Sequence, residues 1–122
     1  DFKDGEQLRD FIYVKDILTI IYWMMEEMIS KQWTDNKNGL YNLGTGKARS
    51  FVDLTKATFK GAGLDEVIEF IDMPEDLRNT YQYFTEATLQ KLREAGYAAQ
   101  FYDLESGIQD YVGKYLVPGK YY

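Results

Sequence analysis

The sequence predicts one α/β domain over residues 1–122, with a few short strands and about four helices. Segments with helical spacing of apolar residues alternate along the chain with short β-branched and aromatic segments. The 122 residues allow a modest core and leave no room for a second domain. The strand-like segments are too few and too short to build a complete wound sheet.

Composition removes several classes of function. The formal charge is −6, which argues against broad electrostatic attraction to nucleic acid. No run approaches the roughly 18 apolar residues that a membrane helix needs. Cysteine and histidine are both absent, so thiol nucleophiles, disulfides, imidazole bases and the usual zinc ligand sets are excluded. We therefore expect no metal site.

The first elements follow an opening, Asp1 to Gly5, that reads as if cut from a longer protein. "RDFIYV" at residues 9–14 is β-branched and aromatic and predicts a short strand or extended segment. Asp16 then suits the cap of a helix reaching to Ile29. Its apolar face is so broad that we expect it to lie inside a larger body or under a partner.

"GLYNLGTG" at residues 39–46 is a short apolar run that ends in a glycine turn. Such a turn between a strand and a helix can hold phosphate with its backbone amides. The dinucleotide fingerprint requires a further glycine where this chain has Arg49, so a structural turn is favoured. Ser50 and Asp53 then resemble a capping box for a helix over about 51–60.

The second half contains two further strand-like runs, each before a helix. "VIEFIDMP" at residues 67–74 alternates as a half-exposed strand would. "TYQYF" leads into Thr85, which suits the cap of a helix ending before Gly96. In an extended run Tyr81 and Tyr83 share one side, while Phe84 points the other way and is expected in the core. Asp103 caps the last helix, which ends before Pro118.

Arg9 is a candidate binding residue, because it stands at the entrance of an apolar strand in an acidic chain. A guanidinium there can grip phosphate with two parallel hydrogen bonds, which lysine cannot reproduce. A salt bridge to Asp10 or another local carboxylate explains the same residue equally well. Sequence alone leaves both interpretations open.

Three motifs together carry a resemblance to a known family. "RDFIYVKDI", "LYNLGTGKARSFVDL" and "TYQYFTEATLQKLREAGY" resemble the C-terminal part of the extended short-chain dehydrogenase/reductases, which belong to the NAD(P)-binding Rossmann superfamily and modify nucleotide sugars. The third motif is narrower and is similar to the ADP-L-glycero-D-manno-heptose 6-epimerase family. The resemblance covers essentially the whole chain.

The resemblance implies a cytoplasmic isomerase whose product is used to build the inner core of lipopolysaccharide. It implies redox epimerisation at C6 of ADP-heptose by tightly held NADP, which takes a hydride and returns it to the other face. The family's catalytic Tyr-x-x-x-Lys and its NADP-binding N-terminal Rossmann domain have no counterpart here. We therefore expect no catalytic and no cofactor-binding residue in this chain, which alone would not turn over. Its own N-terminal domain and further copies in a homo-oligomer are the expected partners.

Two residues match the family's substrate-binding positions by motif. Arg9 matches a substrate-binding arginine, interpreted as a diphosphate contact, and Tyr81 matches a substrate-binding tyrosine. The loop before the arginine also touches substrate in the family, and from it we carry over only Phe2, since the loop is about one residue shorter here.

Two alternatives remain at this stage. One is another nucleotide-sugar epimerase or dehydratase of the same superfamily. The other is a non-catalytic interaction domain, in which the broad apolar helix docks a partner. An upstream glycine-rich βαβ unit with Tyr-x-x-x-Lys in the whole gene would exclude the second.

Overall fold

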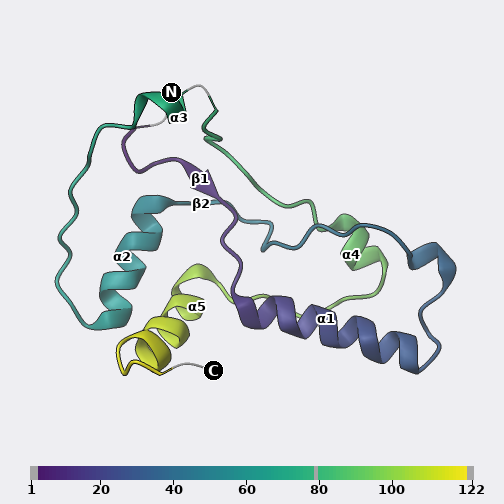
Figure 1. Ribbon diagram of the computed structural model, residues 1–122. Coiled ribbons are helices and arrows are strands. Elements are labelled where there is room, and N and C mark those ends of the chain that lie inside the picture. Colours follow the sequence, from purple (N-terminus) through teal and green to yellow (C-terminus); the bar gives the residue numbers. More distant parts are fainter. Residues whose placement is uncertain (1–2, 79, 121–122) are drawn as a thin grey trace.

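The computed structural model describes residues 3–78 and 80–120. Two strands and five α-helices follow in order within this part of the chain, confirming the α/β class (Figure 1): β1 (Leu8–Arg9), α1 (Val14–Ile29), β2 (Arg49–Ser50), α2 (Phe51–Ala62), α3 (Glu75–Arg78), α4 (Gln90–Glu94) and α5 (Leu104–Tyr111). A short 3-10 helix, η1 (Asp35–Lys37), follows α1, and a π-helical turn, η2 (Val112–Leu116), continues α5.

The sheet is smaller than the sequence predicts. β1 pairs antiparallel with β2, Leu8 opposite Ser50 and Arg9 opposite Arg49. Leu8 also forms a parallel bridge with Phe84. Of residues 9–14, predicted as a short strand or extended segment, only Arg9 is in a strand and Val14 begins α1, because a strand requires a neighbour along its length and β2 supplies only two residues.

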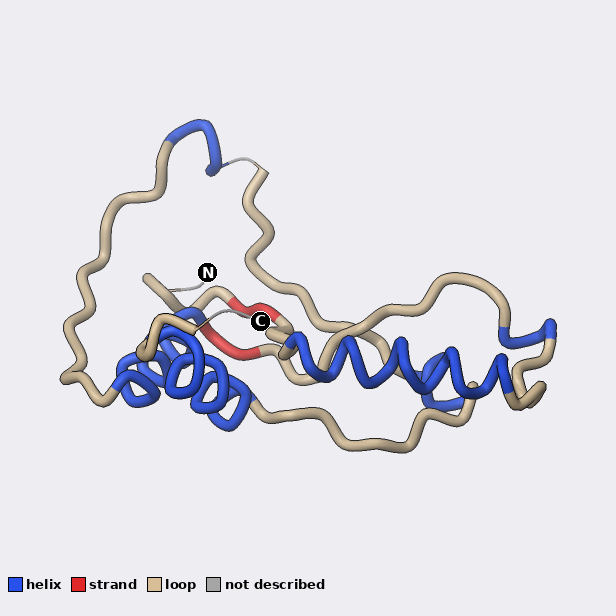
Figure 2. The backbone as a smooth tube through the Cα atoms, turned by 60° about the horizontal axis from the view of Figure 1, so that its bottom comes forward, coloured by secondary structure: helices blue, strands red, loops and turns tan. Residues whose placement is uncertain are grey.

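The predicted strand over residues 67–74 was also wrong. The segment from α2 to α3 is an extended loop that runs apart from the helices (Figures 1 and 2). Its alternation of apolar and polar residues matches a strand pattern, but no described segment pairs with it, and Ile71 is 83% exposed. Residues 40–43, a second apolar run, likewise contain no strand.

α1 begins earlier than predicted, and Asp16 is not its cap. Tyr13 occupies the N-cap position without a side-chain cap bond. Asp16 lies buried in the first turn, where its carboxylate accepts a hydrogen bond from the Tyr102 backbone N–H at 3.1 Å. Burial raises the pKa of this carboxyl, and the Tyr102 bond opposes that rise. Asp16 therefore ties α1 to the segment before α5.

The core of the described residues is small. Ile20 of α1, Leu92 of α4 and Tyr97 form its fully buried centre, with partly buried neighbours packed around them: Trp23, Met24, Tyr41, Leu43 and Phe101. The remaining apolar face of α1 is exposed, as the sequence indicates for a helix that needs a larger body: Val14, Leu18, Ile21, Tyr22, Met25, Met28 and Ile29.

The helix caps at α2 and α5 confirm two predictions. Ser50 and Asp53 form both bonds of a capping box, and the helix ends at Ala62 before Gly63 in the left-handed conformation, with φ of 70°. The Asp103 carboxylate accepts the Ser106 N–H at 2.7 Å at the start of α5. α2 and α5 lie side by side (Figures 1 and 2).

The segment before α4 corrects two more predictions. Thr85 is not a cap, since α4 begins only at Gln90 and the Thr85 N–H donates to the Leu8 carbonyl at 3.1 Å. The Ala87 N–H donates to the Asp10 carboxylate at 3.0 Å, and residues 85–89 form no regular structure. Phe84 is 54% exposed and not in the core, because the small core lies around α1 and α4 instead. Gly96 ends α4 at a positive φ of 111°, as predicted.

Candidate functional site

Arg9 reaches across the chain to the segment containing Tyr81. Its Nη1 donates to the carbonyl of Leu8 at 2.9 Å, and its Nη2 donates to the carbonyl of Gln82. Arg9 forms no ion pair with any carboxylate of the described residues. Its guanidinium is thus oriented by neutral oxygens, which leaves its positive charge uncompensated.

Two aromatic rings flank the same guanidinium. The Arg9 Cζ lies 5.3 Å from the centroid of the Tyr81 ring and 5.9 Å from that of Phe51, within the range of cation–π attraction. Tyr81 and Tyr83 meet edge to face, with ring centroids 5.3 Å apart, so both tyrosines lie on one side of their segment, as predicted. The structure therefore brings Arg9 and Tyr81 together although 71 residues separate them.

Asp10 is not the partner of Arg9. Its carboxylate turns the other way and accepts four hydrogen bonds: from the Thr45 N–H and hydroxyl, the Gly46 N–H and the Ala87 N–H, at 2.6–3.0 Å. Burial opposes ionisation here, but these bonds outweigh it and lower the pKa of Asp10. The salt-bridge interpretation of Arg9 with Asp10 is therefore wrong.

The Gly44–Gly46 turn is structural, as the sequence favours. Its Thr45 and Gly46 amides already bind the Asp10 carboxylate, and a Cβ at Gly44 would collide with Asp10 and Ala87. A dinucleotide pyrophosphate would have to displace that carboxylate, so the turn does not fit such a cofactor. Within residues 3–78 and 80–120 no cluster of potential metal ligands occurs.

A pocket of about 600 Å³ opens beside Tyr81. Its walls come from three segments: residues within 4–7, the loop and helix over 69–78, and the two tyrosines Tyr81 and Tyr83. The Phe70 ring packs at the Gly5 backbone, where an added Cβ would come within 2.9 Å of it. Tyr81 lines this pocket and its ring also contacts the Arg9 guanidinium, but Arg9 is not itself one of the lining residues.

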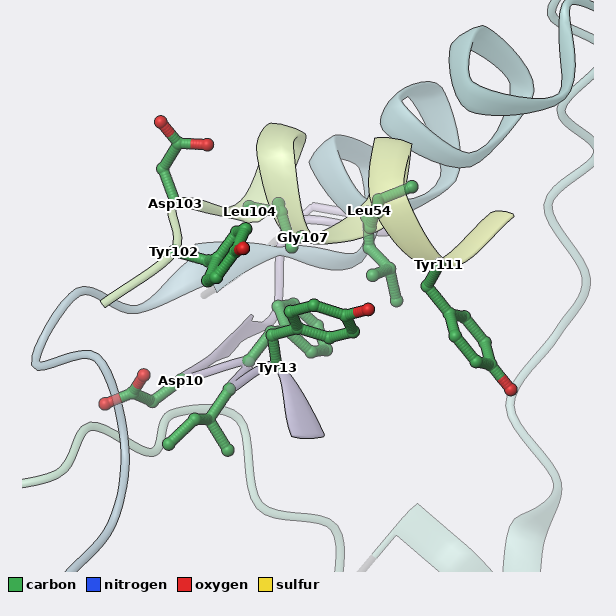
Figure 3. Close-up of a pocket in the computed structure, with 11 residues that line it drawn as sticks. Asp10, Tyr13, Leu54, Tyr102, Asp103, Leu104, Gly107 and Tyr111 are labelled. Atoms are coloured by element: carbon green, nitrogen blue, oxygen red, sulfur yellow. The ribbon is translucent and has the colours of Figure 1, made fainter. Parts of the chain in front are cut away.

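A second, smaller hollow of about 340 Å³ lies between the end of β1, α2 and α5. Figure 3 shows the ring of Tyr13 at its centre, with Tyr102 on one side and Tyr111 on the other. Tyr13 and Tyr102 meet edge to face at 5.2 Å, and Gly107 leaves just enough space for Tyr13. The lining is largely apolar, and neither Arg9 nor Tyr81 belongs to it.

Of the three predicted binding residues, the structure brings Arg9 and Tyr81 together. Phe2, the third predicted binding residue, lies outside the described residues. The Gln82 carbonyl and the Phe51 ring, which orient Arg9, were not predicted, and a backbone carbonyl leaves no signal in a sequence. The role of Asp10 did leave a signal in the sequence. The Gly-Thr-Gly turn presents backbone amides that need an acceptor, and a carboxylate can supply one.

Comparison with known proteins places these features in a family context. Residues 2–44 match the model of the NAD dependent epimerase/dehydratase family. A protein of Fusobacterium nucleatum subsp. nucleatum named ADP-L-glycero-D-manno-heptose-6-epimerase is 54% identical over 121 residues, covering 94% of this chain and 34% of its own length. Proteins of the same name from Nitratidesulfovibrio vulgaris (strain DP4) and Alkalilimnicola ehrlichii are 48% and 38% identical, over 95% and 91% of this chain.

The matches cover nearly the whole of this chain. The chain spans about a third of the length of the relatives that it matches. No helix among the described residues is long and apolar enough to cross a membrane.

Proposed function

Because the chain belongs with the ADP-L-glycero-D-manno-heptose-6-epimerases, its homologues over nearly its whole length, we propose that it forms the substrate-binding part of such an epimerase. The whole protein would interconvert ADP-D-glycero-D-manno-heptose and its C6 epimer for the inner core of lipopolysaccharide, in the cytoplasm. The observation that carries the proposal is the position of Arg9, which forms no ion pair with the described residues, against the ring of Tyr81, which lines a pocket.

The chain's own residues would bind and orient the substrate. Arg9 presents a guanidinium that is already fixed by the Leu8 and Gln82 carbonyls, which lowers the entropy lost when it binds an anion. A diphosphate is the part of a nucleotide sugar that this charge suits. Tyr81 offers an apolar ring face and a hydroxyl that makes no hydrogen bond with the described residues.

The nicotinamide cofactor, NADP in this proposal, supplies the redox chemistry from outside this chain. The proposal places its binding site, together with the catalytic Tyr-x-x-x-Lys, on the further two thirds of chain that the relatives possess. Residues 1–122 alone would then bind substrate without turning it over. The same additional chain, or a second copy, would cover the exposed apolar face of α1.

A turnover assay tests this function. The protein encoded by the whole gene is incubated with ADP-D-glycero-D-manno-heptose, and its conversion to the C6 epimer is followed by proton NMR, with UDP-glucose as the comparison substrate. We expect epimerisation of the ADP-heptose alone. Conversion of UDP-glucose instead would indicate another nucleotide-sugar epimerase, and conversion of neither would favour a non-catalytic interaction domain.

A further inference from the structure

The segment between α2 and α3 has the composition of a strand but no strand beside it. Residues 66–72, "EVIEFID", are rich in β-branched and aromatic side chains. Figures 1 and 2 show the segment drawn out between the two helices and running apart from them. What this segment lacks, within the part of the chain that the structure describes, is a pairing partner.

The backbone of residues 66–72 is unpaired along its whole length. None of its N–H or carbonyl groups forms a hydrogen bond with the described residues. The flanking backbone bonds are local: the Leu64 N–H donates to the Phe59 carbonyl, and the Leu77 N–H donates to the Pro74 carbonyl. A continuous row of unpaired donors and acceptors is the surface to which another strand adds.

The side chains of the segment divide between two sides. In an extended chain Val67, Glu69 and Ile71 point one way and their neighbours point the other way. Phe70, on the second side, packs at the Gly5 backbone of this chain. On the first side Val67 and Ile71 are 77% and 83% exposed. A paired strand would place its own side chains against these two, which is how cross-strand contacts stabilise a sheet.

Charge argues against a second copy of the same segment as the partner. Residues 65–72 contain four acidic residues and no basic one. None of these carboxylates forms an ion pair with a described residue. Two such segments side by side would bring like charges together, which destabilises a strand pair. A neutral or basic strand fits this segment better.

We propose that residues 66–72 form a strand in the whole protein, paired with a neutral or basic strand from the chain that the relatives possess beyond this one. The relatives are about three times as long as this chain. The inference rests on the proposed function only in requiring that additional chain, and it does not depend on the substrate. The two parts of the protein then share one sheet, joined by backbone hydrogen bonds.

Hydrogen exchange resolved to single amides tests the pairing in the wild-type protein of the whole gene, without ligand. Alternate N–H groups of a strand bond to a given neighbour, so at least every second amide of residues 67–72 should be protected. We expect their exchange to be at least about 100-fold slower than in an unstructured chain. Protection below that level at all of these amides, while the amides of α2 are protected in the same sample, overturns the pairing. Turnover of ADP-heptose by that sample would leave the proposed function standing.

A photo-crosslink in the same protein identifies the partner. The photoreactive residue p-benzoylphenylalanine replaces Val67, and a matched control carries it in place of Lys60, an exposed residue in the last turn of α2. We expect position 67 to crosslink to a peptide from outside residues 1–122, in a product with the mass of one chain. A product with the mass of two chains would overturn the choice of partner in favour of a second copy. Crosslinks confined to residues 1–122, or no more frequent than in the control, would overturn the proposal.

Discussion

At the scale of single residues, Arg9 and Asp10 are neighbours in the chain but have different roles. Arg9 is held by neutral carbonyls and rings, so its charge remains available. Asp10 points away and uses its charge inside the chain, on the Gly44–Gly46 turn and on Ala87. The four hydrogen bonds that the Asp10 carboxylate accepts hold it away from Arg9, so the two neighbours form no ion pair with each other.

Arg9→Ala should weaken substrate binding by about 1.5–3 kcal/mol, because it removes a charge-assisted hydrogen bond to the diphosphate. The measurement is calorimetric titration of ADP-heptose into the protein of the whole gene, with thermal unfolding of the same samples. Lys60→Ala serves as the control for a general loss of positive charge. A folded Arg9→Ala variant with unchanged affinity would show that Arg9 only joins β1 to Gln82.

Tyr81→Phe should keep the fold and weaken binding by about 0.5–1.5 kcal/mol, the usual range for a lost neutral hydrogen bond. The phenyl ring still carries the Arg9 guanidinium and still meets Tyr83, so these packing contacts survive. The lost hydroxyl makes no bond with the described residues. Binding affinity and melting temperature are measured on one preparation.

Phe84→Ala provides the matched control for Tyr81→Phe. Full burial of Phe84 would make this substitution cost about 3–5 kcal/mol, but the side chain is 54% exposed, so we expect about 1 kcal/mol or less. A Tyr81→Phe variant that melts early with its affinity intact would make Tyr81 a packing residue and remove it from the pocket.

At the scale of elements, the sequence predicted what local chemistry determines. The capping box at Ser50, the Asp103 cap and the glycines after α2 and α4 act within a few residues of themselves, so their patterns were sufficient. The strand predictions were wrong because a strand depends on a pairing partner that can lie anywhere in the chain. Residues 67–74 have no such partner among the described residues. The prediction of Thr85 as a helix cap was wrong because the Ala87 N–H binds Asp10, which is distant in sequence, and α4 begins only at Gln90.

Asp10→Asn should destabilise the protein by about 1–3 kcal/mol, because the partly buried N–H groups of Thr45, Gly46 and Ala87 lose an ionised acceptor. The folded state holds the pKa of Asp10 below its ordinary value of 3.8. Its contribution to stability is therefore present above pH 3.8 and is lost as pH falls through the lower, folded pKa. Urea unfolding between pH 7 and pH 2 should show less acid sensitivity in Asp10→Asn. Equal acid sensitivity of the two proteins would contradict this role.

At the scale of the whole molecule, the chain has a small core and a large uncovered apolar surface. Its fully buried centre involves Ile20, Leu92 and Tyr97, whereas the outer face of α1 and Leu40, which is 93% exposed, face outward. The relatives are about three times as long as this chain. Such a surface suits contact with more protein, and sequence periodicity indicated it in α1 without identifying what covers it.

Residues 1–122 produced alone should therefore associate, since large exposed apolar patches favour contact between molecules. Analytical ultracentrifugation over a range of concentrations, with an environment-sensitive dye that reports apolar surface, provides the measurement. A double variant, Leu18→Gln with Met25→Gln, should reduce both association and dye binding without touching the Arg9 site. A well-behaved monomer that binds no dye would show that the face of α1 needs no cover.

The assignment of the substrate to the pocket at Arg9 and Tyr81 is tested most directly by hydrogen–deuterium exchange of the whole-gene protein with and without ADP-heptose. We expect slower exchange in peptides covering residues 4–9 and 69–83, where the pocket lies. Peptides over residues 102–111, which line the hollow around Tyr13, should not change. Protection confined to residues 102–111, or no protection in this chain at a ligand concentration that supports turnover, would contradict the assignment.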